Sequence, residues 1–194
     1  MAQRLSNPDR YDEIREEVAN FIEDFGIEAY PFSIWVLLRQ MGIRLIPYSM
    51  FPDQLRSEVE RAWPDAITLR PDNFNAAETV IFYNDQRPRE RIRFTLAHEL
   101  AHLVLEHPDE ESDELEGEAD IFANYLLAPA PLILRDSSVN SYAIEADFVV
   151  SHGCALSARD RTAKRRDFGP RHFTEYEVRI LKTARLVKGG GRVA

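Results

Sequence analysis

The sequence predicts an α+β protein in which helices flank a short mixed or antiparallel sheet. Apolar residues recur at helical spacing in several separate stretches of the chain. Among the earlier of these stretches lie three short runs rich in β-branched and aromatic residues, which predict strands. A chain of 194 residues with 44% hydrophobic content is globular and long enough to bury one ordinary core.

Helices and strands are expected to alternate in the first part of the chain. The helices are expected at residues 11–25, 31–41 and 53–63, and the strands at 43–48, 66–70 and 79–84. Gly26 and Gly42 follow the first two helices as stop signals, and Pro64 ends the third. The polar residues 71–78 predict a loop or hairpin end before the last strand.

The later part of the chain is expected to be helical. Its helices are expected at residues 88–107, 113–128, 142–152 and 156–166, and from Thr174 onward. Gly153 breaks the apolar pattern between two of them, and Glu177 lies three residues after Thr174, as in a capping box. We expect a core domain at residues 1–130 and a helical, helix-turn-helix-like extension at 131–194 packed on it.

Composition excludes several classes of protein. The single cysteine, Cys154, excludes an internal disulfide and a Cys-rich zinc site, and it fits a reducing cytosol. No run of about 18 apolar residues is present, so we expect no membrane span. The polar N-terminus lacks the apolar core of an export signal, and we therefore expect a cytoplasmic protein.

The acidity of the chain is concentrated in one segment. The formal net charge is −9, and residues 106–120 hold nine carboxylates and no Lys or Arg. Outside this segment 24 basic residues balance 24 acidic ones. The net charge therefore draws attention to residues 106–120 rather than to the surface as a whole.

The pattern H-E-x-x-H occupies residues 98–102, within the helix expected at 88–107. Positions i and i+4 lie on one face of a helix, so His98 and His102 can bind a single metal ion. Glu99 can accept a proton from a metal-bound water and pass it to a leaving amine. Zinc is the expected ion, because it accepts imidazole and carboxylate ligands and leaves one position open for water.

A catalytic zinc site requires a third protein ligand, which the acidic segment can supply. No other histidine has the short downstream spacing that completes such a motif on the same helix and turn. On the helix expected at 113–128, Glu118 lies about 60° from the centre of the apolar stripe and Glu116 about 100°. Glu118 is therefore the better candidate to face the metal, and Glu116 remains the alternative.

Two stretches together resemble a known family. The sequence RIRFTLAHELAHLVLEH at residues 91–107, followed by EGEADIFANYLLAP at 116–129, is similar to the ImmA/IrrE-type metallopeptidases. These are small gluzincin-like zinc peptidases of bacteria, phages and mobile elements. The resemblance covers roughly residues 30–130, and Ala101 and Ala128 stand where the family often has Gly and Met.

The resemblance implies a gluzincin-like domain and a set of functional residues. It implies that His98, His102 and Glu118 bind zinc and that Glu99 is the general base. It also implies a site-specific endopeptidase that cleaves a helix-turn-helix transcriptional repressor, usually encoded nearby, and thereby releases stress or mobile-element genes.

Two parts of such a site remain open in the sequence. Tyr83, Tyr125 and His152 are candidates to stabilise a tetrahedral oxyanion, and the sequence does not choose among them. The strand expected at residues 79–84 precedes the metal helix and is our candidate for a sheet edge that holds an extended peptide.

Two other functions compete with peptide hydrolysis. The first is a non-proteolytic zinc-binding regulator that sequesters a repressor. The second is a DNA-binding module in which the basic side chains of residues 144–166 contact phosphates. These side chains are Arg159, Arg161, Lys164, Arg165 and Arg166. We favour a helical subdomain with a solvated basic face and expect no direct binding to nucleic acid.

Overall fold

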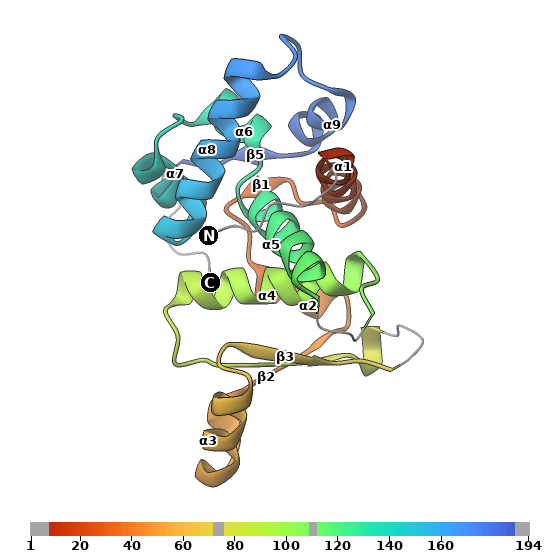
Figure 1. Cartoon of the computed structure of the whole chain (residues 1–194), viewed down its shortest axis with the longest axis vertical. Coiled ribbons are helices and arrows are strands. Elements are labelled where there is room, and N and C mark those ends of the chain that lie inside the picture. Colours follow the sequence, from red (N-terminus) through yellow and green to blue (C-terminus); the bar gives the residue numbers. More distant parts are fainter. Residues whose placement is uncertain (1–7, 72–75, 109–111, 189–194) are drawn as a thin grey trace. The chain divides into compact units, whose positions relative to one another are not determined.

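A computed structural model describes residues 8–71, 76–108 and 112–188 (Figure 1). The chain forms two compact units, one of residues 33–108 and the other of residues 1–32 together with 109–194. The second unit is therefore built from two separate stretches of chain. Each unit is described by itself below.

The continuous unit, residues 33–108, contains a three-stranded mixed sheet. Its strands are β2 (Arg44–Pro47), β3 (Ala66–Leu69) and β4 (Val80–Tyr83), in the order β2-β4-β3. β4 pairs parallel with β2 and antiparallel with β3. The prediction that residues 79–84 form a sheet edge is wrong, because strands on both sides use the backbone groups of β4.

Helices α2 (Ile34–Gln40) and α4 (Arg89–Val104) pack against the sheet and against each other (Figure 1). Ser33 caps α2 through its hydroxyl, and Gly42, with φ of +84°, reverses the chain into β2. α4 buries an apolar stripe in the interior of the unit. A third helix, α3 (Asp53–Ala62), joins β2 to β3 after the short 3₁₀ turn η1 (Tyr48–Met50), and a second 3₁₀ turn, η2 (Ala76–Glu78), precedes β4.

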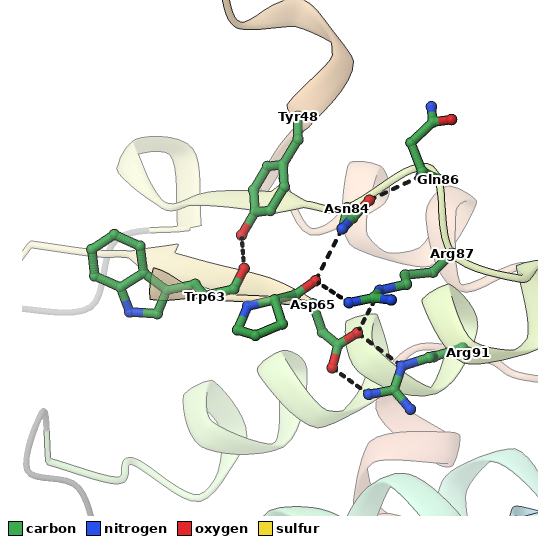
Figure 2. A network of polar contacts seen from close by, with 8 residues as sticks. Tyr48, Trp63, Asp65, Asn84, Gln86, Arg87 and Arg91 are labelled. Atoms are coloured by element: carbon green, nitrogen blue, oxygen red, sulfur yellow. Dashed lines mark hydrogen bonds and ion pairs between the residues drawn. The ribbon is translucent and has the colours of Figure 1, made fainter. Parts of the chain in front are cut away.

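A network of polar contacts fixes the start of α4 to the loops at one end of the sheet (Figure 2). Asp65 forms ion pairs with Arg87 and Arg91, the latter through both carboxylate oxygens. The Pro64 carbonyl accepts hydrogen bonds from Asn84 and Arg87 at 3.0 and 3.2 Å. The network therefore joins the loop before β3, the loop after β4 and the first turn of α4.

The discontinuous unit is mainly helical. Its elements are α1 (Pro8–Asp24), β1 (Ala29–Tyr30), α5 (Asp113–Leu127), α6 (Ala130–Asp136), α7 (Ser141–Phe148), α8 (His152–Phe168), α9 (Glu175–Thr183) and β5 (Arg185–Leu186). α1 packs against α5 and α9, and α8 packs against α5, α6 and α7. β1 and β5 form a two-stranded parallel pair, which joins the early and late parts of this unit.

A buried ion pair links α8 to α9. The Arg165 guanidinium donates to both carboxylate oxygens of Glu177 at 2.7 Å, and Glu177 also accepts from the Thr174 backbone N–H at 2.8 Å. The expected capping box of Thr174 and Glu177 is thus confirmed, with the same carboxylate holding α8.

Most of the expected helices and strands are confirmed, and the structure differs from the expectation in two ways. α6, β1 and β5 were not predicted. The break between α7 and α8 lies at 149–151, where Val149 has φ of +52°, and Gly153 is inside α8. The reason is that Ser151 caps α8 at the Cys154 N–H, so the helix begins before the glycine.

The helices of the expected extension, residues 131–194, belong to the same compact unit as α1 and α5. The expected domain boundary near residue 130 stays a prediction. Within the described part of the chain, no helix combines the length and the apolar character needed to cross a bilayer.

Candidate metal centre

The two histidines of the H-E-x-x-H pattern converge on one side of α4. His98 and His102 are half-buried, and their Nε2 atoms lie 3.0 Å apart. Two imidazole ligands about 2.0–2.1 Å from one tetrahedral zinc have nitrogens about 3.3 Å apart. The donor types and their spacing therefore fit a zinc ion, provided that the two rings move slightly apart.

The orientation of α4 follows from its buried stripe. Leu96, Leu100 and Leu103 are almost completely buried in the unit of residues 33–108. Residues 98, 99 and 102 lie at the border of this stripe, and each side chain is half-buried. The buried apolar face thus fixes the orientation of α4, and the residues at its border place the two imidazoles and the Glu99 carboxylate on one side.

Glu99, the predicted general base, is held by a strand. The Thr68 hydroxyl, on β3, donates a hydrogen bond of 2.6 Å to Glu99 Oε2. β3 lies at an edge of the sheet and contacts α4. A carboxylate fixed at one oxygen keeps its other oxygen in a defined orientation, as a general base requires. Sequence reasoning missed Thr68, since a threonine in a strand carries no signal of such a contact.

The chain folds back on itself at the end of α4. Glu106 has φ of +53°, the His107 N–H donates to the His102 carbonyl at 3.0 Å, and the Glu106 N–H donates to Leu103 at 3.4 Å. This is a Schellman motif, which sets the residue two positions after the cap against the third residue from the helix end. Those two residues are His107 and His102, and their Nδ1 atoms lie 3.0 Å apart.

Glu118 lies on α5, in the other unit, and is buried there. Arg10 of α1 donates to both of its carboxylate oxygens, from Nε at 2.9 Å and from the terminal guanidinium nitrogen at 2.6 Å. This contact raises the pKa of Arg10 above its usual range. Glu116, two residues earlier on α5, is exposed. The choice between the two carboxylates as the third ligand stays a prediction.

The three candidates for oxyanion stabilisation differ in their surroundings. Tyr83 ends β4, and burial raises the pKa of its phenol. Tyr125 is completely buried on α5 between Arg15 and Arg161, whose guanidinium carbons lie 6.0 and 5.0 Å from its ring centre. The exposed His152 forms an ion-pair contact of 2.8 Å with Glu145. A completely buried phenol cannot reach a substrate, so Tyr125 is the weakest of the three.

Four of the five basic residues of α8 have internal or local partners. Arg161 is half-buried and donates to Asn124 and to the Ala128 carbonyl, and desolvation of its guanidinium lowers its pKa to about 10. Arg165 is held by Glu177, as described above. Arg159 and Arg166 pair with the neighbouring residues 160 and 167. Arg161 and Arg165 therefore make structural contacts within the helical unit.

The central part of the chain matches a known protein family. The model of the IrrE N-terminal-like domain matches residues 59–157, just over half of the chain. The matched region runs from within α3 into α8 and includes both α4 and α5. The chain belongs to the ImmA/IrrE-type family of peptidases, and this membership supports a function of the metallopeptidase type. No curated protein sequence matches the chain.

Proposed function

We propose that this protein is a zinc-dependent, site-specific endopeptidase that acts in the cytoplasm. The observation that carries the proposal is the convergence of His98 and His102, with Nε2 atoms 3.0 Å apart, beside a Glu99 carboxylate that Thr68 holds in place. Family membership supports the same reaction class.

In this proposal zinc supplies the acidity of the attacking water and the polarisation of the scissile carbonyl. His98 and His102 would hold the ion through Nε2. Glu99 would remove a proton from the attacking water as the water oxygen bonds to the carbonyl carbon. It would return that proton to the amine nitrogen when the C–N bond then breaks. Thr68 keeps the Glu99 carboxylate oriented for both transfers.

The third ligand is a carboxylate of α5. Glu118 is the residue in register with the family pattern, and Glu116 is the alternative. The contact of Arg10 with Glu118 supports an ionised carboxylate at that position, which a ligand must be. A change of Glu118 to Gln is expected to reduce zinc binding more than a change of Glu116 to Gln.

The substrate we propose is a helix-turn-helix repressor encoded nearby, cleaved in an extended segment. Because β4 is the central strand, the two edges that can accept such a segment are β2 and β3, and we favour β3. Thr68 on β3 contacts Glu99, so a peptide added to this strand lies near the proposed base. The edge strand therefore supports an extended substrate better than the strand expected from the sequence.

Co-expression with the neighbouring repressor tests the proposal. We expect the wild-type chain to release two repressor fragments whose masses define one cut site, and the Glu99→Gln variant to release none. Zinc measured on the purified proteins is expected at one ion per chain in both, and to be lost in His98→Ala.

Two outcomes would contradict the proposal. Cleavage by the Glu99→Gln variant at the wild-type rate would show that Glu99 is not the general base. An intact repressor in a stable complex with the zinc-loaded wild-type chain would instead support the non-proteolytic regulator.

A further inference from the structure

His107 lies outside the H-E-x-x-H pattern, yet its ring contacts the second histidine of that pattern. The two Nδ1 atoms are 3.0 Å apart, the ring centres are 5.0 Å apart, and the planes are nearly perpendicular at 78°. His107 is 3% exposed. All of these contacts lie within the unit of residues 33–108.

The backbone holds His107 in this position from two sides. Its N–H donates to the His102 carbonyl, and its own carbonyl accepts from the Arg70 guanidinium. The left-handed conformation of Glu106 turns the chain so that both bonds can form. The ring of His107 is therefore fixed by the turn that ends α4.

The neighbours of His102 indicate which of its ring nitrogens carries the proton. His102 faces His98 with Nε2 and faces His107 with Nδ1, so its two nitrogens have different neighbours. A neutral imidazole carries one N–H, and Nε2 must carry no proton in order to bind a metal. The proton of His102 then belongs on Nδ1, and Nδ1 of His107, 3.0 Å away, is placed to accept it.

We propose that His107 is a positioning residue that accepts the Nδ1–H hydrogen bond of His102 and so fixes the tautomer in which His102 Nε2 binds the metal. The inference rests on the proposed zinc function and extends it to a residue that the pattern does not contain. Metal-bound histidines generally donate their second N–H to an acceptor, and loss of that acceptor weakens metal binding by about 10–100-fold.

The contact between His102 and His107 joins two polar rings at positions where apolar packing is usual. In a Schellman motif the same two positions usually make an apolar contact. Here both are imidazoles, and a buried imidazole is costly unless its nitrogens are hydrogen-bonded. A leucine at residue 107 preserves the usual apolar contact, which makes it a sharp test of the hydrogen bond.

The test compares three variants of residue 107. His107→Leu removes the acceptor and keeps an apolar contact. His107→Asn places an amide oxygen near the position of Nδ1, whereas His107→Gln places one near Nε2. Zinc affinity is measured by competition with a chromophoric chelator, and the His102 tautomer by two-bond proton–nitrogen NMR correlations on the chelator-treated protein.

We expect zinc to bind about 10–100-fold more weakly to the Leu and Gln variants and within about threefold of wild type to the Asn variant. We also expect His102 to be protonated on Nδ1 in the wild-type and Asn proteins, and to shift toward Nε2–H in the Leu variant. Unchanged affinity and tautomer in His107→Leu would overturn the inference, as would an Asn variant as weak as the Leu variant.

The two measurements separate this inference from the proposed function. If the wild-type chain binds no zinc, the proposed function fails, while the tautomer of His102 still reports whether His107 is its acceptor. If zinc binds and the tautomer is independent of residue 107, the positioning role alone fails.

Discussion

At the candidate site, the neutral side chain of Thr68 orients the carboxylate of Glu99 through a hydrogen bond. The hydroxyl donates at 2.6 Å to one carboxylate oxygen, and Thr68 belongs to an edge strand while Glu99 belongs to α4. The orientation of the proposed base therefore depends on the sheet as well as on its own helix.

Removal of this hydroxyl is expected to slow repressor cleavage. Thr68→Val keeps the shape of the side chain and removes a hydrogen bond to a charged group, worth about 1.5–3 kcal/mol, so we expect a cleavage rate at least about 10-fold lower. Zinc content should be unchanged. Thr68→Ser, which keeps the hydroxyl, is the control and should cleave at close to the wild-type rate; equal rates in all three proteins would mean that the contact does not orient Glu99.

At the residue scale, the pattern H-E-x-x-H was sufficient to predict that His98 and His102 lie side by side on a helix. It was not sufficient for His107, because its approach depends on a left-handed residue, Glu106, at a position where glycine is the usual signal. A histidine three positions after the last residue of α4 is the sequence feature that could have indicated the contact.

Helices α8 and α9 are joined by the ion pair of Arg165 and Glu177. The Glu177 side chain is 1% exposed and that of Arg165 is 14% exposed, so solvent screens this pair little. The arginine also donates to the carbonyls of Pro170 and His172 in the connecting loop. One guanidinium therefore ties together the end of α8, the loop and the start of α9.

Glu177→Ala is expected to destabilise the protein by about 3–5 kcal/mol, because it leaves a guanidinium without its buried partner. Glu175→Ala, in the same helix turn but exposed, should cost less than about 1 kcal/mol and serves as the matched control. Urea unfolding followed by circular dichroism measures both values, and similar losses in the two variants would count against a structural role for the pair.

The network at the start of α4 predicts a dependence of stability on pH. The hydrogen bonds and charges of Arg91 and then Arg87 hold the pKa of Asp65 below its ordinary value. Stabilisation by this ionised carboxylate is complete above its ordinary pKa of about 4 and is lost as the pH falls through the lowered value.

Asp65→Asn should therefore reduce the free energy of unfolding by about 1 kcal/mol near pH 7, a modest value because the pair is partly exposed to solvent. Below the ordinary aspartate pKa the difference between variant and wild type should shrink. Urea unfolding at pH 7 and at pH 3 measures this, and a difference that is the same at both pH values would contradict the assignment.

At the scale of elements, the long helices and the three strands of the sheet could be predicted because their apolar patterns are regular. β1 and β5 have two residues each, too few to form a pattern. The order β2-β4-β3 is set by contacts between distant segments, so the central position of β4 could not be read from the strand itself.

The whole molecule carries a net charge of −9, and the basic residues of α8 are largely engaged in internal or local contacts. Affinity for DNA depends on free basic groups that neutralise phosphates and release counterions. We expect no gel shift of duplex DNA, even at a salt concentration of about 50 mM, where such binding is strongest. A shift that weakens steeply as salt is raised would revive the DNA-binding alternative.

The acidic segment at residues 106–120 is resolved into parts with different roles. Glu106 makes the turn after α4, Asp113 and Glu114 lie in the first turn of α5, where the helix dipole favours acidic residues, and Glu118 is buried against Arg10. Residues 109–111 lie outside the described part of the chain. Sequence reasoning predicted an inward-facing Glu118; its contact with Arg10 joins residues far apart in the chain and carries no local signal.

The discontinuity of the larger unit has a consequence for synthesis on the ribosome. Residues 33–108 are continuous, so the unit that carries α4 can fold as soon as it leaves the exit tunnel. The other unit needs β5 and α9 to complete its contacts with β1 and α1, and must wait for the end of the described chain. The histidine pair is therefore expected to form early, while α5 with its carboxylates acquires its full packing last.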